Sequence, residues 1–180
     1  MRLGQVELEE FAGLSTMPQG AASALDKVDV VGAGYKPLIY CGYQDYDLGD
    51  KVSADFELEK FAGVANMPEE ARDEWEAFED LGADYVPLQY LGKQHVNGVN
   101  HYFIAEQTLV TNPFERRVVL VLVNGGKLVG AENVIKKVAQ EEGRNHYFIA
   151  EQTLVTYPPI RKVVLLIVND GDIVAVEGIL

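Results

Sequence analysis

The chain contains three histidines, the side chains used most often for metal binding and for acid–base chemistry near neutral pH. They are His95, His101 and His146, and the last two occupy equivalent positions in a repeated segment. A lone strand histidine that is repeated by duplication is more often a packing or surface residue than a ligand. The sequence has no paired Cys or His at a metal-ligand spacing. We therefore expect no metal site.

The other reactive side chains also lack the neighbours that catalysis needs. Cys41 is the single cysteine, and a second sequence repeat, described below, aligns it with Leu91. We therefore expect Cys41 to be a small buried hydrophobic residue rather than a reactive thiol. Glu106 and Glu151 fall in the middle of predicted strands, and we expect them to face solvent on the open side of a sheet. The sequence has no glycine-rich phosphate loop and no G-x-S-x-G motif. We expect a protein that is not an enzyme and needs no cofactor.

These residues belong to a nested duplication. Residues 100–111 recur without change as residues 145–156, and this match extends over residues 100–135 and 145–180. A separate match relates residues 6–44 to residues 56–94. The order of first half, first half, second half, second half indicates that one copy interrupts the other.

The nesting predicts two domains. We expect a split domain A formed by residues 1–48 and 137–180, and an inserted domain B formed by residues 49–136. In a rival arrangement, the first half of each copy packs on the second half of the other. The sequence does not separate these two pairings, because both use equivalent contacts.

Composition limits the classes of partner. The 180 residues carry a net charge of −13, which argues against nucleic acid and anionic membranes, since both attract clustered Lys and Arg. No apolar stretch reaches the roughly 18 residues of a membrane-spanning helix, and the first residues include acids where a signal peptide would be apolar. We expect a cytoplasmic protein.

Each copy reads as one helix followed by strands. Pro18 and Pro68 suit the first helical turn, and Gly32 and Gly82 suit the stop. The apolar stripes expected to face the core are Ala21, Leu25, Val28 and Val31 in copy A, and Ala71, Trp75, Phe78 and Leu81 in copy B.

Extended segments are expected after each helix, and the segment at residues 56–61 is a candidate edge strand. The fold class expected is α+β, with two units that each pack one helix on a four- to five-stranded antiparallel sheet. The expected strands are residues 35–43, 145–156, 161–168 and 172–179 in copy A, and residues 85–93, 100–111, 116–123 and 127–134 in copy B.

Two of these strands are apolar at every position, namely residues 118–123 and 163–168. A sheet with one open face should alternate apolar and polar residues. We therefore expect the outer face to be covered by the other copy or by a second chain, which makes self-association through these strands one expected interaction. A protein partner is the alternative cover.

The segment between the expected strands at residues 85–93 and 100–111 of copy B carries a family resemblance. Gln94-His95-Val96-Asn97-Gly98, followed by an aromatic strand, resembles the QxVxG hairpin of the cystatins, especially the disulfide-free stefins. Gly13 and Gly63, each with a proline five residues later, resemble the glycine trunk that precedes the helix of that family. The resemblance implies a cystatin-like fold in both copies.

The resemblance also implies inhibition of papain-like cysteine proteases by a wedge made of the trunk, the QxVxG hairpin and a second hairpin with Pro-Trp. Here the second hairpins, residues 124–126 and 169–171, contain neither Pro nor Trp, and copy A has lost its QxVxG sequence. Our first hypothesis is a non-catalytic interaction or scaffold protein. The alternative is a protease inhibitor whose binding residues are Gly63, Gln94, His95, Val96, Asn97 and Gly98.

Overall fold

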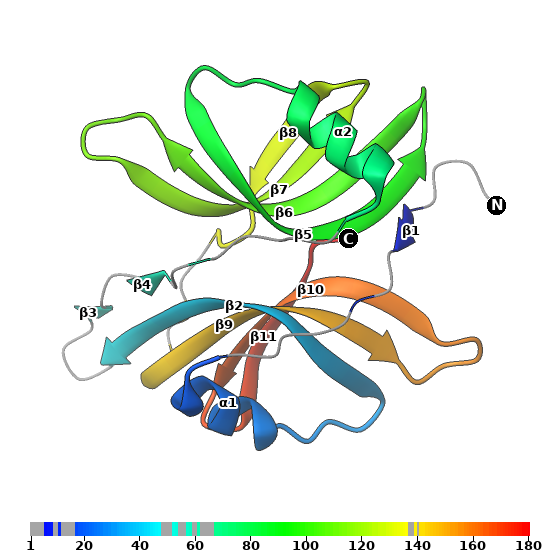
Figure 1. The fold of residues 1–180 in the computed structure, drawn as a ribbon. Helices are drawn as coiled ribbons and strands as arrows, with labels where there is room; N and C mark the ends of the chain where they lie inside the picture. Colours follow the sequence, from blue (N-terminus) through cyan, green and yellow to red (C-terminus); the bar gives the residue numbers. More distant parts are fainter. Residues whose placement is uncertain are drawn as a thin grey trace. The chain divides into compact units, whose positions relative to one another are not determined.

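A computed structural model describes most of the chain: residues 6–8, 11, 17–47, 52–53, 57–58, 61, 67–136, 139 and 141–180. The chain divides into two compact units. Unit 1 comprises Met1–Glu10 and Lys60–Ile135, and unit 2 comprises Phe11–Glu59 and Lys136–Leu180. Both units are built mainly from antiparallel sheet (Figure 1).

Unit 1 contains a five-stranded sheet in the order β1-β5-β6-β7-β8. The helix α2, Glu69–Ala77, lies across one face of this sheet (Figure 1). The strands are β1 (Val6–Leu8), β5 (Ala83–His95), β6 (Val99–Leu109), β7 (Glu115–Asn124) and β8 (Lys127–Asn133).

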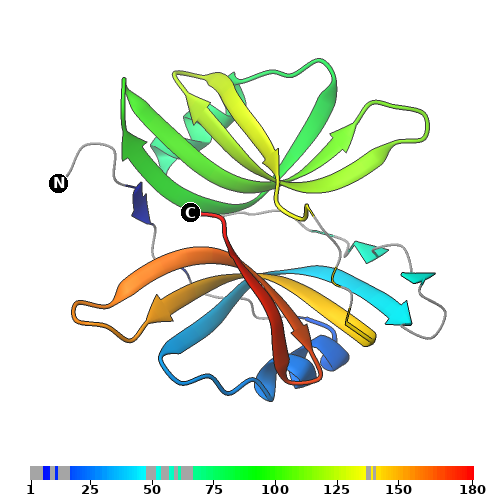
Figure 2. The ribbon, with the colours of Figure 1, turned by 180° about the vertical axis from the view of Figure 1, so that it is seen from behind.

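Unit 2 contains a six-stranded sheet in which β11-β10-β9-β2-β3 follow one another and β4 also pairs with β2. Its helix is α1, Gln19–Asp26. Seen from behind, β11 runs along β10 at one edge of the sheet (Figure 2). The strands are β2 (Ala33–Asp47), β3 (Val52–Ser53), β4 (Glu57–Leu58), β9 (Gly143–Leu154), β10 (Ile160–Asn169) and β11 (Asp172–Gly178).

The long strands pair within each copy rather than across the copies. β6 pairs with β5, from His95 opposite Val99 to Ala83 opposite Leu109. β9 pairs in the same way with β2, although the two strands lie about a hundred residues apart in the sequence. Of the two arrangements left open by the sequence, the observed pairing is the nested one.

The short edge strands follow the opposite rule. β1, which precedes α1 in the sequence, pairs with Gly92–Gln94 of β5 in unit 1. β4, which precedes α2, pairs with Gly42 and Tyr43 of β2 in unit 2. Each unit therefore takes its edge strand from the segment that precedes the helix of the other unit. β4 also confirms a strand within residues 56–61.

Each sheet buries one apolar cluster against its helix. In unit 1, Ala71 of α2 packs with Phe103 of β6 and Val121 of β7, and Trp75 and Phe78 pack partly buried against them. In unit 2, Ala21 and Ala24 of α1 pack with Phe148. The helices present only alanine as fully buried side chains, so most of the core volume comes from the strands.

The expected α+β class is wrong, because strand accounts for 59% of the structure and helix for 12%.

The helices end before the apolar stripes do: α1 stops at Asp26 and α2 at Ala77. Phe78 already has an extended backbone, with φ −84° and ψ 152°. Val31 and Leu81, which were expected in the core, are each 98% exposed.

The two all-apolar runs, residues 118–123 and 163–168, are buried except at Leu122, which is half-buried. The six residues from Val163 to Val168 are each at most 4% exposed, and Val118, Val119, Val121 and Val123 are equally hidden. Alternate residues of each run, such as Val119 and Val164, belong to the clusters under the helices. The identity of the cover on the opposite face stays a prediction.

No helix among the described residues is both long enough and apolar enough to cross a membrane.

Candidate functional site

The hairpin between β5 and β6 forms an exposed loop of three residues. His95 pairs with Val99, and Val96, Asn97 and Gly98 make the turn between them. Asn97 and Gly98 have φ values of 49° and 99°, in the left-handed region. A Cβ at position 98 would lie 3.1 Å from Asn124 Oδ1, so glycine suits both the backbone and the space.

Gln94 orders the base of this loop. Its side-chain oxygen Oε1 accepts hydrogen bonds from the Tyr102 hydroxyl at 2.6 Å and from Asn100 Nδ2 at 3.3 Å. Both donors lie on β6, so the amide ties the two strands of the hairpin together. The geometry gives Gln94 a positioning role, whereas Val96 at the loop is 40% exposed.

A second hairpin, between β7 and β8, lies against the first. Asn124 Nδ2 donates to the Asn97 carbonyl oxygen at 3.2 Å and to Asn100 Oδ1 at 2.8 Å. The turn uses Gly125 and Gly126, with φ values of 61° and 76°. The side chain of Asn124 thus joins the two loops, and we call its two hydrogen bonds the brace.

The helix α2 supports the second hairpin from the other side. The Gly126 N–H donates to Glu74 Oε1 at 3.1 Å. A Cβ on Gly126 would lie only 3.0 Å from the Cβ of Ala77, so a side chain at this position would collide with the helix. The β5–β6 loop, the β7–β8 loop and α2 therefore form one connected edge of unit 1.

Unit 2 repeats the brace without the loop. Asn169 Nδ2 donates to the Glu142 carbonyl oxygen at 2.9 Å and to Asn145 Oδ1 at 3.0 Å. Gly143, with φ 103°, takes the place of Gly98. The chain that would close the loop instead continues along β2 to Asp47, where β3 pairs with it.

An ion pair lies at the corresponding position of unit 2. Arg144 Nε and Nη2 donate to the two carboxylate oxygens of Asp45 at 2.8 and 3.0 Å, and this guanidinium holds the pKa of Asp45 below its usual range. The guanidinium also lies 4.0 Å from the centre of the Tyr43 ring. This edge is charged, unlike the hairpin of unit 1.

Two of the three histidines are buried beside tyrosines. His101 Nδ1 and the Tyr90 hydroxyl are 2.9 Å apart, and His146 Nδ1 and the Tyr40 hydroxyl are separated by the same distance. Burial lowers the pKa of both imidazoles, because it disfavours their charged form. Both are packing residues, as the sequence indicated. His95 is half-buried at the end of β5.

The expected solvent exposure of Glu106 and Glu151 is wrong. They are 9% and 8% exposed, and each carboxylate accepts a hydrogen bond from an arginine Nε, Arg116 and Arg161 respectively. Both faces of these strands are covered, so a charge at this position needs a partner. The signal available in the sequence was the same Glu and Arg spacing in both copies.

Cys41 confirms the sequence interpretation. Its side chain is fully buried, and burial raises the pKa of the thiol to about 12. Among the residues that the structure describes, no group of three or more His, Cys, Asp or Glu side chains is arranged to hold a metal ion.

Of the six expected binding residues, the structure places Gln94–Gly98 together on one hairpin, and Gly63 lies outside the described residues. The sequence interpretation missed Asn124, which was read only as a turn residue. The signal for its role was that asparagine occupies both 124 and 169, although the turns that follow differ.

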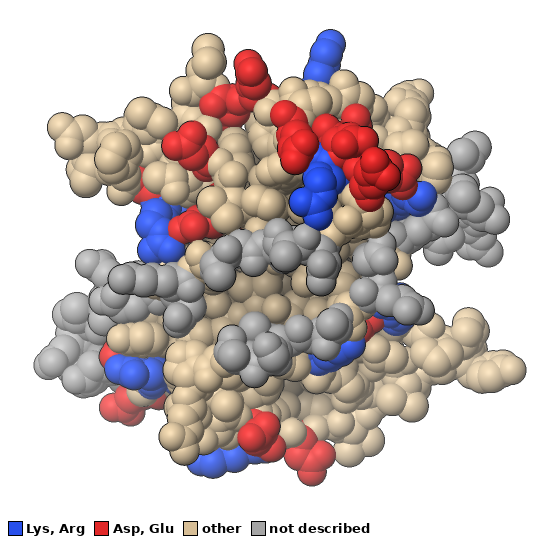
Figure 3. Space-filling model, in the orientation of Figure 1, with Lys and Arg blue, Asp and Glu red and all other residues tan. Residues whose placement is uncertain are grey.

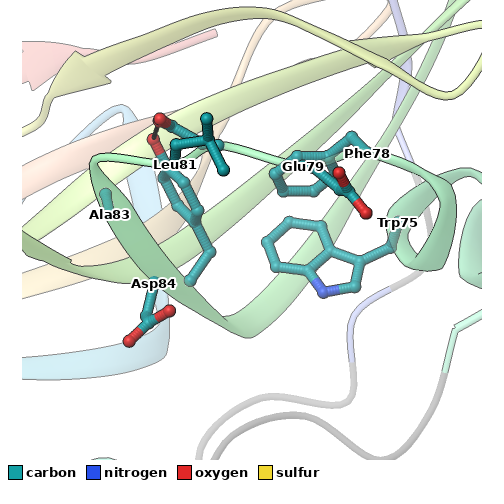
Figure 4. A pocket seen from close by; sticks show the side chains of 8 residues that line it. Trp75, Phe78, Glu79, Leu81, Ala83 and Asp84 are labelled. Atoms are coloured by element: carbon teal, nitrogen blue, oxygen red, sulfur yellow. Dashed lines mark hydrogen bonds between the residues drawn. The ribbon is translucent and has the colours of Figure 1, made fainter.

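Unit 1 also has a pocket at the end of α2, distinct from the hairpins. It has a volume of about 410 Å³ and is lined by aromatic and acidic side chains from the helix, the following turn and the start of β5 (Figure 4).

No protein-family model, curated protein or solved structure matches the chain. The resemblance of residues 94–98 to the cystatin hairpin therefore stays a prediction.

Proposed function

We propose that the chain is a non-catalytic binding protein whose contact surface is the pair of hairpins on unit 1. The observation that carries this proposal is the brace of Asn124, which hydrogen bonds to Asn97 and Asn100 across the two loops. A loop held in place before binding loses less conformational entropy when it meets a partner.

The chemistry of the loop suits contact with a groove. Val96, Asn97 and Gly98 are exposed, and none of the three carries a charge. The glycine lets a partner approach the main chain closely, and the valine offers an apolar side chain. The matching edge of unit 2 has Asp45 and Arg144 instead, so we assign binding to unit 1 alone.

Backbone dynamics test whether this edge is ordered before binding. We expect ¹⁵N order parameters close to the value of about 0.85 that rigid backbone gives at Asn97, Gly98 and Gly125. Values below about 0.6 at these three residues would remove the preordered surface and with it the proposal.

A papain-like cysteine protease is the candidate partner favoured by the exposure of Val96, which is 40%. The hairpin would enter the protease cleft as an uncleaved mimic of substrate, with main chain and Val96 filling the cleft. This candidate rests on the QxVxG resemblance of residues 94–98. The Pro-Trp pair that cystatins use in their second hairpin is absent, because this chain has Asn124-Gly125-Gly126 there.

Titration of papain activity with the intact chain tests this candidate. Val96→Asp should weaken inhibition by about tenfold or more, because an unpaired carboxylate would be buried in an apolar cleft. Val110→Asp is the matched control, since Val110 is 59% exposed just beyond β6, at the end of that strand opposite the hairpin. Absence of inhibition at micromolar concentration would exclude papain as a target, and equal effects of the two variants would exclude the hairpin.

A further inference from the structure

The pocket at the end of α2 presents three aromatic rings. Trp75 and Phe78 meet edge to face with centroids 4.9 Å apart, and Phe78 and Tyr85 meet at 5.5 Å. Trp75 also packs on Phe103 at 4.8 Å, so it is anchored in the core. Trp75 and Phe78 lie side by side on one side of the pocket, whereas Ala83 and Asp84 lie on the other (Figure 4).

Carboxylates surround these rings. Asp80 is held by the Gly82 N–H at 3.0 Å and by the Tyr85 hydroxyl at 2.7 Å. Glu79 and Asp84 are exposed, and neither side-chain carboxylate has a hydrogen bond or ion pair with any residue that the structure describes. Two carboxylates are thus available beside an aromatic surface.

We propose that this pocket binds the side chain of an arginine presented by a partner or peptide. Aromatic faces and carboxylates both attract cations. The centroids of Trp75 and Tyr85 are 6.5 Å apart, which leaves no room for a quaternary ammonium group enclosed between the rings. A planar guanidinium needs only one open ring face for stacking, and its fork of donors matches a carboxylate.

The charge of the surrounding surface favours the same ligand. Acidic side chains gather over α2 on the face shown in Figure 3, and the helix itself contributes Glu69, Glu70, Asp73, Glu74 and Glu76. The whole chain carries a net charge of −13, so a cationic segment is attracted before it makes contact.

Unit 2 shows that this chemistry is not a requirement of the fold. Tyr35 matches Tyr85, and each accepts a hydrogen bond from a glutamine of the neighbouring strand at 3.0 Å. The positions of Trp75, Phe78, Asp80 and Asp84 are occupied by Leu25, Val28, Val30 and Gly34. The scaffold is the same in both units, but only unit 1 combines three rings with three acids.

The pocket shares no lining residue with the two hairpins, so it can be tested separately. Trp75 is the one tryptophan of the chain and lines this pocket, so its fluorescence in the folded protein responds to a ligand bound there. Acetyl-arginine amide added at millimolar concentration should give a saturable change in fluorescence. Acetyl-citrulline amide, which has nearly the same shape without the charge, should give none. Acetyl-lysine amide with a free side-chain amine should bind several-fold more weakly, because an ammonium does not stack.

Variants of the exposed acids complete the test. Glu79→Gln and Asp84→Asn should each weaken arginine binding by about 1.5- to 5-fold, the range for an exposed ion pair, and should leave the urea midpoint unchanged. Asp29→Asn in unit 2, the counterpart of Glu79→Gln, should have no effect on binding. A response to citrulline equal to that of arginine would overturn the proposal. So would equal binding of lysine, or unchanged arginine binding when Glu79→Gln and Asp84→Asn are combined in one variant.

Discussion

Asn124→Ala removes the side chain that joins the two hairpins of unit 1. It deletes the hydrogen bond to the exposed Asn97 carbonyl oxygen, at 3.2 Å, and the one to the half-buried Asn100 Oδ1, at 2.8 Å. A typical hydrogen bond contributes about 0.5–1.5 kcal/mol net. Water replaces the exposed bond readily, so we expect unit 1 to lose roughly 1–2 kcal/mol of unfolding free energy.

Urea unfolding monitored by Trp75 fluorescence measures this loss, because the single tryptophan lies in unit 1. Small domains have slopes of about 1–3 kcal/mol per molar urea, so the midpoint should fall by roughly 0.3–2 M. Asn169→Ala removes the matching pair of hydrogen bonds from unit 2 and is the control for a general effect of the substitution.

The two variants should differ in function more than in stability. Both remove two hydrogen bonds, but only Asn124→Ala should lower the order parameters at residues 96–98 and weaken any partner held by that loop. An unchanged midpoint together with unchanged order parameters in Asn124→Ala would refute the reasoning that the brace positions the hairpin.

Three further predictions concern buried groups. The pKa of His101 and His146 is lower in the folded chain than in the unfolded chain. The stability that these neutral imidazoles contribute is therefore complete above the pKa of histidine in the unfolded chain, near 6.5, and is lost as the pH falls from there through the folded pKa. The urea midpoint should be lower at pH 5 than at pH 7.5. Equal midpoints at the two pH values would contradict this prediction. Phe103→Ala should cost unit 1 about 3–5 kcal/mol in the same fluorescence assay, because the ring is fully buried, and a loss below about 1 kcal/mol would show that the cluster is not packed as described. Cys41 should react with a thiol reagent only when the chain is unfolded, because its thiol is buried with a pKa of about 12; fast labelling of native protein would contradict this.

The long strands could be predicted from the sequence, because their signals are local, whereas the short strands β1 and β3 were not predicted. Alternating or fully apolar runs bounded by turn residues such as Asn124-Gly125-Gly126 mark the long strands within a few residues of the observed ends. The helices were predicted too long for a physical reason. Leu81 continues the helical spacing of Ala71 and Trp75, but the backbone is already extended at Phe78.

Other features depend on long-range contacts that a pattern does not encode. Burial of Glu106 follows from coverage of both faces of its strand, and the arginine that neutralises it lies on the next strand. The exchange of edge strands was equally hidden, because residues 7–9 and 57–59 have the identical sequence Glu-Leu-Glu. Because the two segments are alike, local sequence gives no preference for one sheet over the other. For the candidate site, the hairpin was visible as a motif, whereas the hydrogen bonds of Asn124 and the aromatic pocket depend on residues far apart in the sequence.

The pairing of β1 with β5 affects the order in which the two sheets can form during synthesis. Val6 is synthesised 88 residues before its partner Gln94. At about 5–20 residues per second, the first strand waits roughly 4–18 s for the sheet that it completes. The middle of the chain then closes unit 1 while β2 still lacks β9, so unit 2 is the last to mature even though its helix is translated first.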